Sequence, residues 1–127
     1  MHELLLAQPS ESAPDLPTDQ IEAWLRNQRF LLRDEQRGTF LLCGNPAATQ
    51  YTRMRLLTEP DEPLPTVVLV RIQDREIQIW QRAEDSALLQ AKDLVQWLVT
   101  NLECRIMTPE GDDMTERLDE EYAGLPE

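Results

Sequence analysis

Few side chains in this sequence have the types and the spacing that catalysis or metal binding requires. The only histidine is His2, so a Ser–His or Cys–His nucleophilic pair would depend on a residue that we expect in a mobile segment. The two cysteines, Cys43 and Cys104, lie far apart and have no histidine near them, so zinc is not expected. We interpret them as partly buried free thiols, with one disulfide as the alternative if their strands are neighbours.

Acidic residues and glycines also lack a catalytic or nucleotide-binding pattern. Asp34 with Glu35, and Asp61 with Glu62, are adjacent carboxylates in predicted loops, where solvated charge is the commoner explanation. Residues 110–113 do not have the ligand spacing of an EF-hand loop. The glycines are too far apart in the sequence to cradle a phosphate. We therefore expect no cofactor and no metal, and the sequence favours a protein that is not an enzyme.

The one pattern with binding chemistry combines arginine and aromatic residues on predicted strands. Residues 51–58 alternate between the two sides of a predicted strand, which places Tyr51, Arg53 and Arg55 on the same side. That strand is expected to be half-buried, with its other side on the core.

Residues 66–72 and 76–80 predict the clearest β-hairpin in the chain. With Asp74 and Arg75 as the turn, residue 72 pairs with 77 and residue 70 with 79, which gives one continuous apolar face. The opposite face then presents four side chains: Leu69, Arg71, Gln78 and Trp80.

We predict that one solvent-facing surface collects the candidate partner-binding residues, which are Tyr51, Arg53, Arg55, Arg71 and Trp80. Tyrosine, tryptophan and arginine are enriched where protein interfaces concentrate their binding energy. Three interpretations stay open. The acidic ends of the chain cover this surface, or a protein partner binds it, or single-stranded nucleic acid stacks on its two aromatic rings. The formal charge of −12 disfavours nucleic acid.

The periodicity along the chain predicts an α+β domain: an antiparallel meander of about five strands, with a short N-terminal helix and a long helix packed on one face. The short helix begins near Asp19, which is followed by Glu22 as in a capping box. The long helix covers residues 87–102, where apolar side chains recur every three or four residues. Further strands are predicted at residues 30–33, 39–43 and 104–107.

We divide the chain into a flexible leader at residues 1–17, a single domain at 18–108 and an acidic C-terminal tail at 109–127. The proline-rich residues 59–65 are expected to form a stiff polyproline II loop. Three apolar tail residues are spaced to share one side of a short helix: Met114, Leu118 and Tyr122. This helix either docks on its own domain or is a ligand for another protein.

Charge and hydropathy indicate a small, soluble, cytoplasmic protein of bacterial type. The acidity is concentrated at the two ends of the chain, no apolar run could span a bilayer, and no secretory signal is recognised. Our leading hypothesis is a non-catalytic module, such as an adaptor, chaperone-like or immunity-like protein. It would bind a protein partner through the arginine and aromatic sheet face, the acidic tail or both, and a homodimer is a further outcome. The alternative is a small-ligand-binding domain or minor enzyme with a pocket between the long helix and the sheet.

Overall fold

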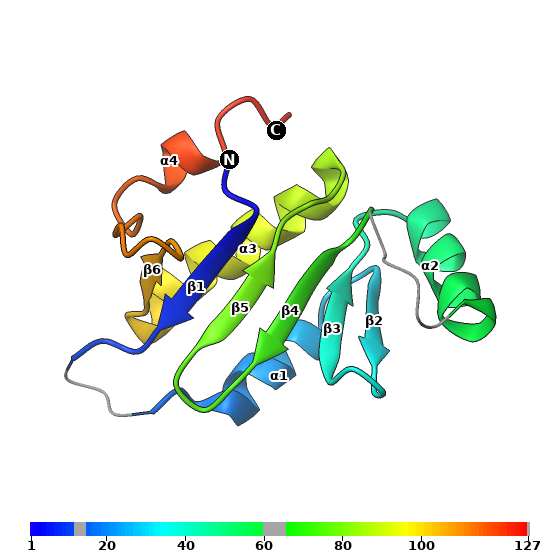
Figure 1. Cartoon of the computed structure of the whole chain (residues 1–127), viewed down its shortest axis with the longest axis horizontal. Helices are drawn as coiled ribbons and strands as arrows, with labels where there is room; N and C mark the ends of the chain where they lie inside the picture. Colours follow the sequence, from blue (N-terminus) through cyan, green and yellow to red (C-terminus); the bar gives the residue numbers. More distant parts are fainter. Residues whose placement is uncertain (12–14, 60–65, 127) are drawn as a thin grey trace.

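The computed structural model describes residues 1–11, 15–59 and 66–126. Within these residues, six strands form one antiparallel sheet in the order β2-β3-β4-β5-β1-β6 (Figure 1). The strands are β1 (Leu4–Gln8), β2 (Leu31–Asp34), β3 (Thr39–Leu42), β4 (Val68–Ile72), β5 (Ile77–Trp80) and β6 (Arg105–Met107). The helices are α1 (Thr18–Arg26), α2 (Pro46–Thr58), α3 (Asp85–Leu102) and α4 (Leu118–Glu121).

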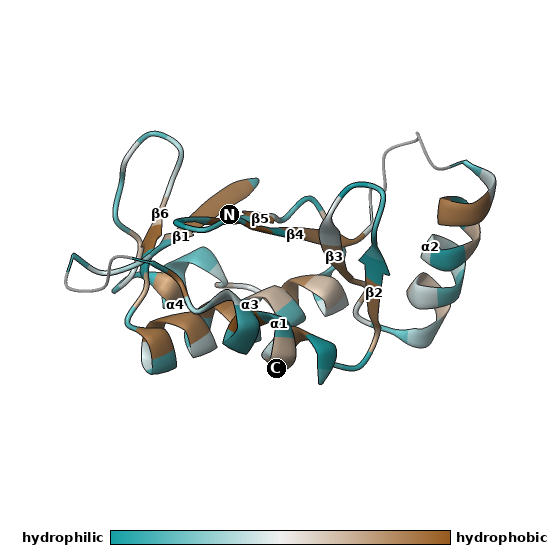
Figure 2. Ribbon diagram, turned by 90° about the horizontal axis from the view of Figure 1, so that it is seen from below, coloured by the Kyte–Doolittle hydropathy of each residue, from teal (hydrophilic) through white to brown (hydrophobic). Residues whose placement is uncertain are grey.

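Helices α1 and α3 form a second layer on one face of the sheet (Figure 2). Alternate residues of each strand point at this layer, as do Val70 of β4 and Ile79 of β5, which are paired and fully buried. Leu94 of α3 is buried in the same core. Trp24 of α1 stacks on Trp97 of α3, with 5.3 Å between the ring centroids. The core therefore lies between one sheet face and the apolar sides of two helices.

The sequence-based predictions for the β-hairpin and the long helix are confirmed. Strands β4 and β5 pair residue 70 with 79 and residue 72 with 77, and the backbone N–H of Gln73 donates to the carbonyl oxygen of Glu76 across the turn (2.9 Å). Helix α3 buries the predicted apolar side. The fold class, α+β with an antiparallel sheet, is confirmed as well.

The flexible leader predicted over residues 1–17 is wrong for residues 4–8, which form β1. Strand β1 lies between β5 and β6 and pairs with both, so the sheet has more strands than expected and is not a simple meander. Leu5 and Ala7 are fully buried in the core. A short apolar run can become a strand when strands distant in the sequence pair with it on both sides, and local composition does not reveal this. Residues 12–14 of the predicted leader lie outside the described part of the chain.

The strand predicted over residues 51–58 is also wrong, because Pro46–Thr58 form helix α2. Asn45 caps this helix, since its Oδ1 accepts a hydrogen bond from the backbone N–H of Ala48 (2.8 Å). Pro46 stands in the first turn, where the missing N–H of proline removes no helical hydrogen bond. These start signals and the good helix formers that follow prevail over the alternating pattern of the sequence.

The acidic tail docks on its own domain, as one of the two alternatives predicted. Its helix α4 is shorter than the predicted stripe, but Met114 and Tyr122 reach the main core and are 6% and 3% exposed. The predicted polyproline loop falls largely on residues 60–65, outside the described residues. Among the helices that the structure describes, none has the length and hydropathy to cross a membrane.

Candidate functional site

The sheet face opposite α1 and α3 is only partly covered. At the end formed by β2 and β3, helix α2 contributes to a second small core, in which Leu41, Cys43 and Val67 are buried and Ala48 and Leu56 pack against them. Over β4, β5, β1 and β6, the same face carries no helix in the described part of the chain (Figures 1 and 2). A sheet face that keeps apolar side chains without a covering layer is a candidate binding surface.

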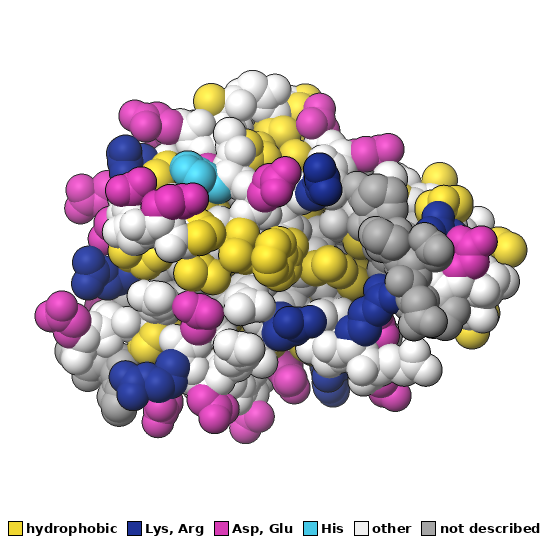
Figure 3. Space-filling view, viewed as in Figure 1, with side chains coloured by type: hydrophobic (Ala, Val, Ile, Leu, Met, Phe, Trp, Pro, Cys, Tyr) yellow, Lys and Arg dark blue, Asp and Glu magenta, His cyan; other side chains and the backbone are white. Residues whose placement is uncertain are grey.

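A row of apolar side chains crosses the uncovered strands. The register pairs Leu4 with Trp80 and Trp80 with Leu69, and beside this row Leu6 pairs with Met107. These side chains point away from α3, because the residues next to them in each strand are the buried core residues. The Trp80 surface, as we define it, consists of Leu4, Leu6, Leu69, Arg71, Gln78, Trp80 and Met107. Figure 3 shows a hydrophobic band across the middle of this face, with charged groups on both sides of it.

The rim of the Trp80 surface is polar. Arg71 is exposed and forms no ion pair with any residue that the structure describes. Next to the Trp80 ring, Glu3 and Arg82 form an exposed ion pair of 3.8 Å. A shallow pocket of about 360 Å³ extends from the ring to Glu110 in the turn after β6. An apolar centre inside a charged rim is the usual anatomy of a protein interface.

Of the five predicted binding residues, the structure places Arg71 and Trp80 on this surface and the other three on α2. The shared strand side that grouped Tyr51, Arg53 and Arg55 does not exist. Arg55 is held within its own helix, where its guanidinium donates to Tyr51 Oη (2.8 Å) and lies 3.0 Å from a glutamate carboxylate one turn later. Arg53 instead lines a groove between α2 and β2. Partner binding by the three α2 residues stays a prediction.

The sequence analysis missed Leu4, Leu6 and Met107, which are three of the five apolar residues of the Trp80 surface. In β1 the core residue Leu5 stands between two leucines of the opposite face, so the run shows no alternation of polarity that would mark a strand with two different sides. The only sequence signal is the apolar run itself.

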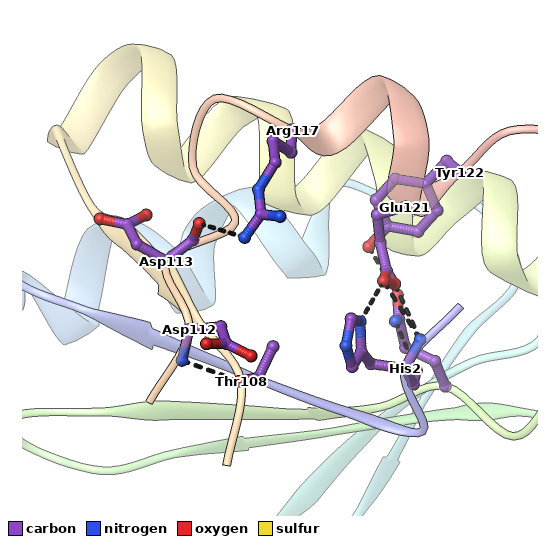
Figure 4. Close-up of polar contacts among 8 residues, drawn as sticks. His2, Thr108, Asp112, Asp113, Arg117, Glu121 and Tyr122 are labelled. Carbon is purple, nitrogen blue, oxygen red and sulfur yellow. Dashed lines mark hydrogen bonds and ion pairs between the residues drawn. The ribbon is translucent and has the colours of Figure 1, made fainter. Parts of the chain in front are cut away.

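A polar network that includes the buried residues Glu121 and Tyr122 joins the tail to His2 near the start of the chain (Figure 4). Glu121 is 3% exposed, and its carboxylate oxygens accept hydrogen bonds from the backbone N–H of His2 at 2.9 and 3.1 Å. Its Oε1 also lies 2.6 Å from His2 Nδ1. Tyr122 Oη donates to Gln81 Oε1 (2.5 Å), and Gln81 Nε2 donates to the carbonyl oxygen of His2 (3.0 Å).

Burial, together with the neighbouring Glu121 charge, raises the pKa of Tyr122, so the phenol stays protonated and can act as the donor in this network. The described part of the tail therefore docks next to the Trp80 surface without covering it, and Trp80 remains 41% exposed. This arrangement does not match the interpretation in which the acidic ends cover the surface.

The described residues contain no group of three His, Cys, Asp or Glu side chains that could hold a metal ion. Cys43 and Cys104 are buried free thiols, as predicted. Burial raises the pKa of Cys104 to about 11 and also raises that of Cys43, so neither thiol is an activated nucleophile. The layer between α3 and the sheet, where the alternative hypothesis expects a ligand pocket, is filled by core side chains. Four pockets formed by described residues lie elsewhere on the surface.

Comparisons with protein-family models, with curated protein sequences and with solved structures find no match for this chain. The class of this protein is therefore described from its fold and its candidate site. It is an α+β protein whose antiparallel sheet is covered by helices on one face and, by the residues that the structure describes, only in part on the other.

Proposed function

We propose that this protein is a non-catalytic interaction module that binds a partner protein through the Trp80 surface, as an adaptor, chaperone-like or immunity-like protein would. The observation that carries the proposal is the apolar row Leu4, Trp80 and Leu69, which crosses three neighbouring strands. No helix of the described part of the chain lies over Leu4 or Trp80 (Figures 1 and 2), and Leu69 at the end of the row packs against the small core of Leu41, Cys43 and Val67. A partner that buries this row gains about 25 cal/mol for each Å² of apolar surface removed from water.

The composition of the surface indicates what kind of partner it fits. Tryptophan at the centre and arginine beside it are both among the residue types enriched among interface residues that dominate binding energy. Arg71 has no described ion-pair partner, so an acidic side chain of the partner would gain a charge-assisted contact there. Nucleic acid is disfavoured, because the chain carries a formal charge of −12 and would repel a polyanion.

Site-specific photocrosslinking in native lysate tests the proposal. A photoreactive phenylalanine analogue is introduced at Gln78, in the middle of the Trp80 surface, and as a control at Gln96, which is exposed on α3. We expect a heavier protein adduct from position 78 that is absent from position 96 and is lost when Trp80→Ala is added. An adduct with the mass of two copies would identify a homodimer. Adducts of equal yield at both positions, or none at position 78, would contradict the proposal.

A further inference from the structure

The two edges of the sheet differ in whether their outward backbone groups have hydrogen-bond partners. On the outer edge of β6, residues of the tail form hydrogen bonds with the backbone groups of Ile106. Its carbonyl oxygen accepts from the N–H of Met114 (2.7 Å), and its N–H donates to Thr115 Oγ1 (2.9 Å). Covering an edge in this way prevents another chain from pairing with it. The opposite edge is formed by β2, whose outward backbone groups have no such hydrogen-bond partner among the described residues, although α2 lies beside this edge (Figure 1).

The register shows which backbone groups of β2 face outward. The N–H of Cys43 donates to the carbonyl oxygen of Phe30 (2.9 Å), so residues 30 and 43 form a hydrogen-bonded pair. Because such pairs alternate along an antiparallel ladder, the N–H and C=O groups of Leu31 and Arg33 point away from β3. None of these four groups has a hydrogen-bond partner in the described part of the chain.

A groove runs along this edge, between β2 and α2. It has a volume of about 450 Å³ and is lined by Leu32, Arg33, Asp34, Glu35, Gln36, Arg53, Leu56 and Leu57. The lining includes both Leu32 and Arg33, and successive residues of a strand point to opposite faces of the sheet, so the groove borders the backbone of β2. Leu57 of α2 is 80% exposed, which leaves an apolar side chain opposite the free backbone groups.

The charge of the groove differs from that of the whole chain. Arg53 and Arg33 form no ion pair with described residues, although the Arg33 guanidinium stacks over the Phe40 ring at 4.5 Å. Asp34 is paired with Arg37 at 3.7 Å, so among the described lining residues Glu35 is the acidic side chain without an ion pair. Two arginines and two acidic residues line the groove, so it does not share the excess negative charge of the whole chain, whose formal charge is −12, and an acidic group can approach Arg53 there.

We propose that the β2 edge binds an extended segment of a partner protein by strand addition. The added strand hydrogen-bonds to the backbone of Leu31 and Arg33. Its alternate apolar side chains fill the groove against Leu56 and Leu57, and an acidic side chain approaches Arg53. This mode of recognition takes affinity from main-chain hydrogen bonds and specificity from side-chain contacts. The site lies at the opposite end of the sheet from β1 and β6 and is separate from the Trp80 surface.

A random nine-residue peptide library displayed on phage provides the probe. Peptides are selected on the wild-type protein with counter-selection on Arg33→Pro, which replaces the outward N–H by a ring carbon. Proline is tolerated on an edge strand where the N–H faces outward. Arg33→Ala is the matched control, because it also removes the guanidinium but keeps the N–H.

We expect enriched peptides with alternating apolar and acidic residues that bind Arg33→Ala at least tenfold more tightly than Arg33→Pro. Arg53→Glu should weaken these acidic peptides at least fivefold. Hydrogen exchange of the Arg33 amide in the wild-type protein, slowed at least tenfold by the bound peptide, supports strand addition even if Arg33→Pro fails to fold. No enriched peptide, or peptides that leave Arg33 amide exchange unchanged, would overturn the proposal. Trp80→Ala leaves the β2 edge intact, so it should not change the binding of these peptides, whereas it should remove the crosslinked adduct at the Trp80 surface. The failure of one proposal can therefore be distinguished from the failure of the other.

Discussion

Gly44 joins β3 to α2, and its substitution by alanine tests how α2 is held in place. Gly44 has a φ of +86°, and a Cβ added there would lie 2.4 Å from the backbone nitrogen of Ala87 and 2.5 Å from the carbonyl carbon of Ser86, at the start of α3. Its N–H donates to Gln90 Oε1 (2.8 Å). The junction therefore needs both a left-handed backbone and the absence of a side chain.

Three contributions add up in Gly44→Ala. A left-handed backbone costs an alanine about 1 kcal/mol relative to glycine. Forcing a methyl group against the backbone of another helix costs about 1–3 kcal/mol, and weakening the hydrogen bond to Gln90 costs about 1 kcal/mol. We expect a total of about 3–5 kcal/mol, which is a large fraction of the roughly 5–15 kcal/mol that stabilises an ordinary domain.

Gly38 supplies the matched control. It also has a positive φ, of +66°, but a Cβ there would have nothing within 4 Å, so Gly38→Ala should cost only the backbone contribution of about 1 kcal/mol. Urea unfolding followed by circular dichroism measures both free energies of unfolding. Equal destabilisation by the two substitutions would refute the close approach of Gly44 to α3, and with it the placement of α2.

Two further predictions concern the buried polar network and the buried thiols. Glu121→Gln should lower the free energy of unfolding by about 1.5–3 kcal/mol, because it removes a charged acceptor bonded to His2. The control is Glu120→Gln, at an exposed neighbouring residue, which should change the free energy of unfolding by less than about 0.5 kcal/mol. If urea unfolding gave the same loss of stability for both variants, the result would contradict the network. Since burial raises the pKa of Cys104 to about 11, this thiol stays protonated in the folded protein while it ionises in the unfolded chain. Its contribution to stability is complete below about pH 8.5 and falls by about 1.4 kcal/mol per pH unit up to pH 11. The difference between wild type and Cys104→Ala across that range should show this slope, and a constant difference would contradict it.

The parts of the fold that could be predicted are those with local signals. The β4–β5 hairpin has two apolar runs around a two-residue turn, and α3 has a long stripe at helical spacing, so both were predicted with the correct sides buried. Strand β1 could not be predicted this way, because its place between β5 and β6 is set by pairing with distant strands.

The candidate site was half predicted for the same reason. Arg71 and Trp80 belong to the hairpin, and their side of the sheet followed from its register. The error at Tyr51 and Arg53 arose because polar and apolar residues alternate within a segment that also contains good helix formers, while the residue that caps the helix, Asn45, lies before the segment in which the alternation is seen. Leu4 was missed because β1 was not recognised.

The most direct test of the central claim is the affinity of the partner identified by crosslinking, measured by calorimetry for wild type and for Trp80→Ala. Met54→Ala is the control, since Met54 is 65% exposed on α2 and lies outside the Trp80 surface. Truncation of an aromatic residue at the centre of an interface costs about 2 kcal/mol or more, which corresponds to a loss of about 30-fold in affinity. We predict that loss for Trp80→Ala and less than a twofold change for Met54→Ala. Unchanged affinity for Trp80→Ala would contradict the claim that this sheet surface binds the partner.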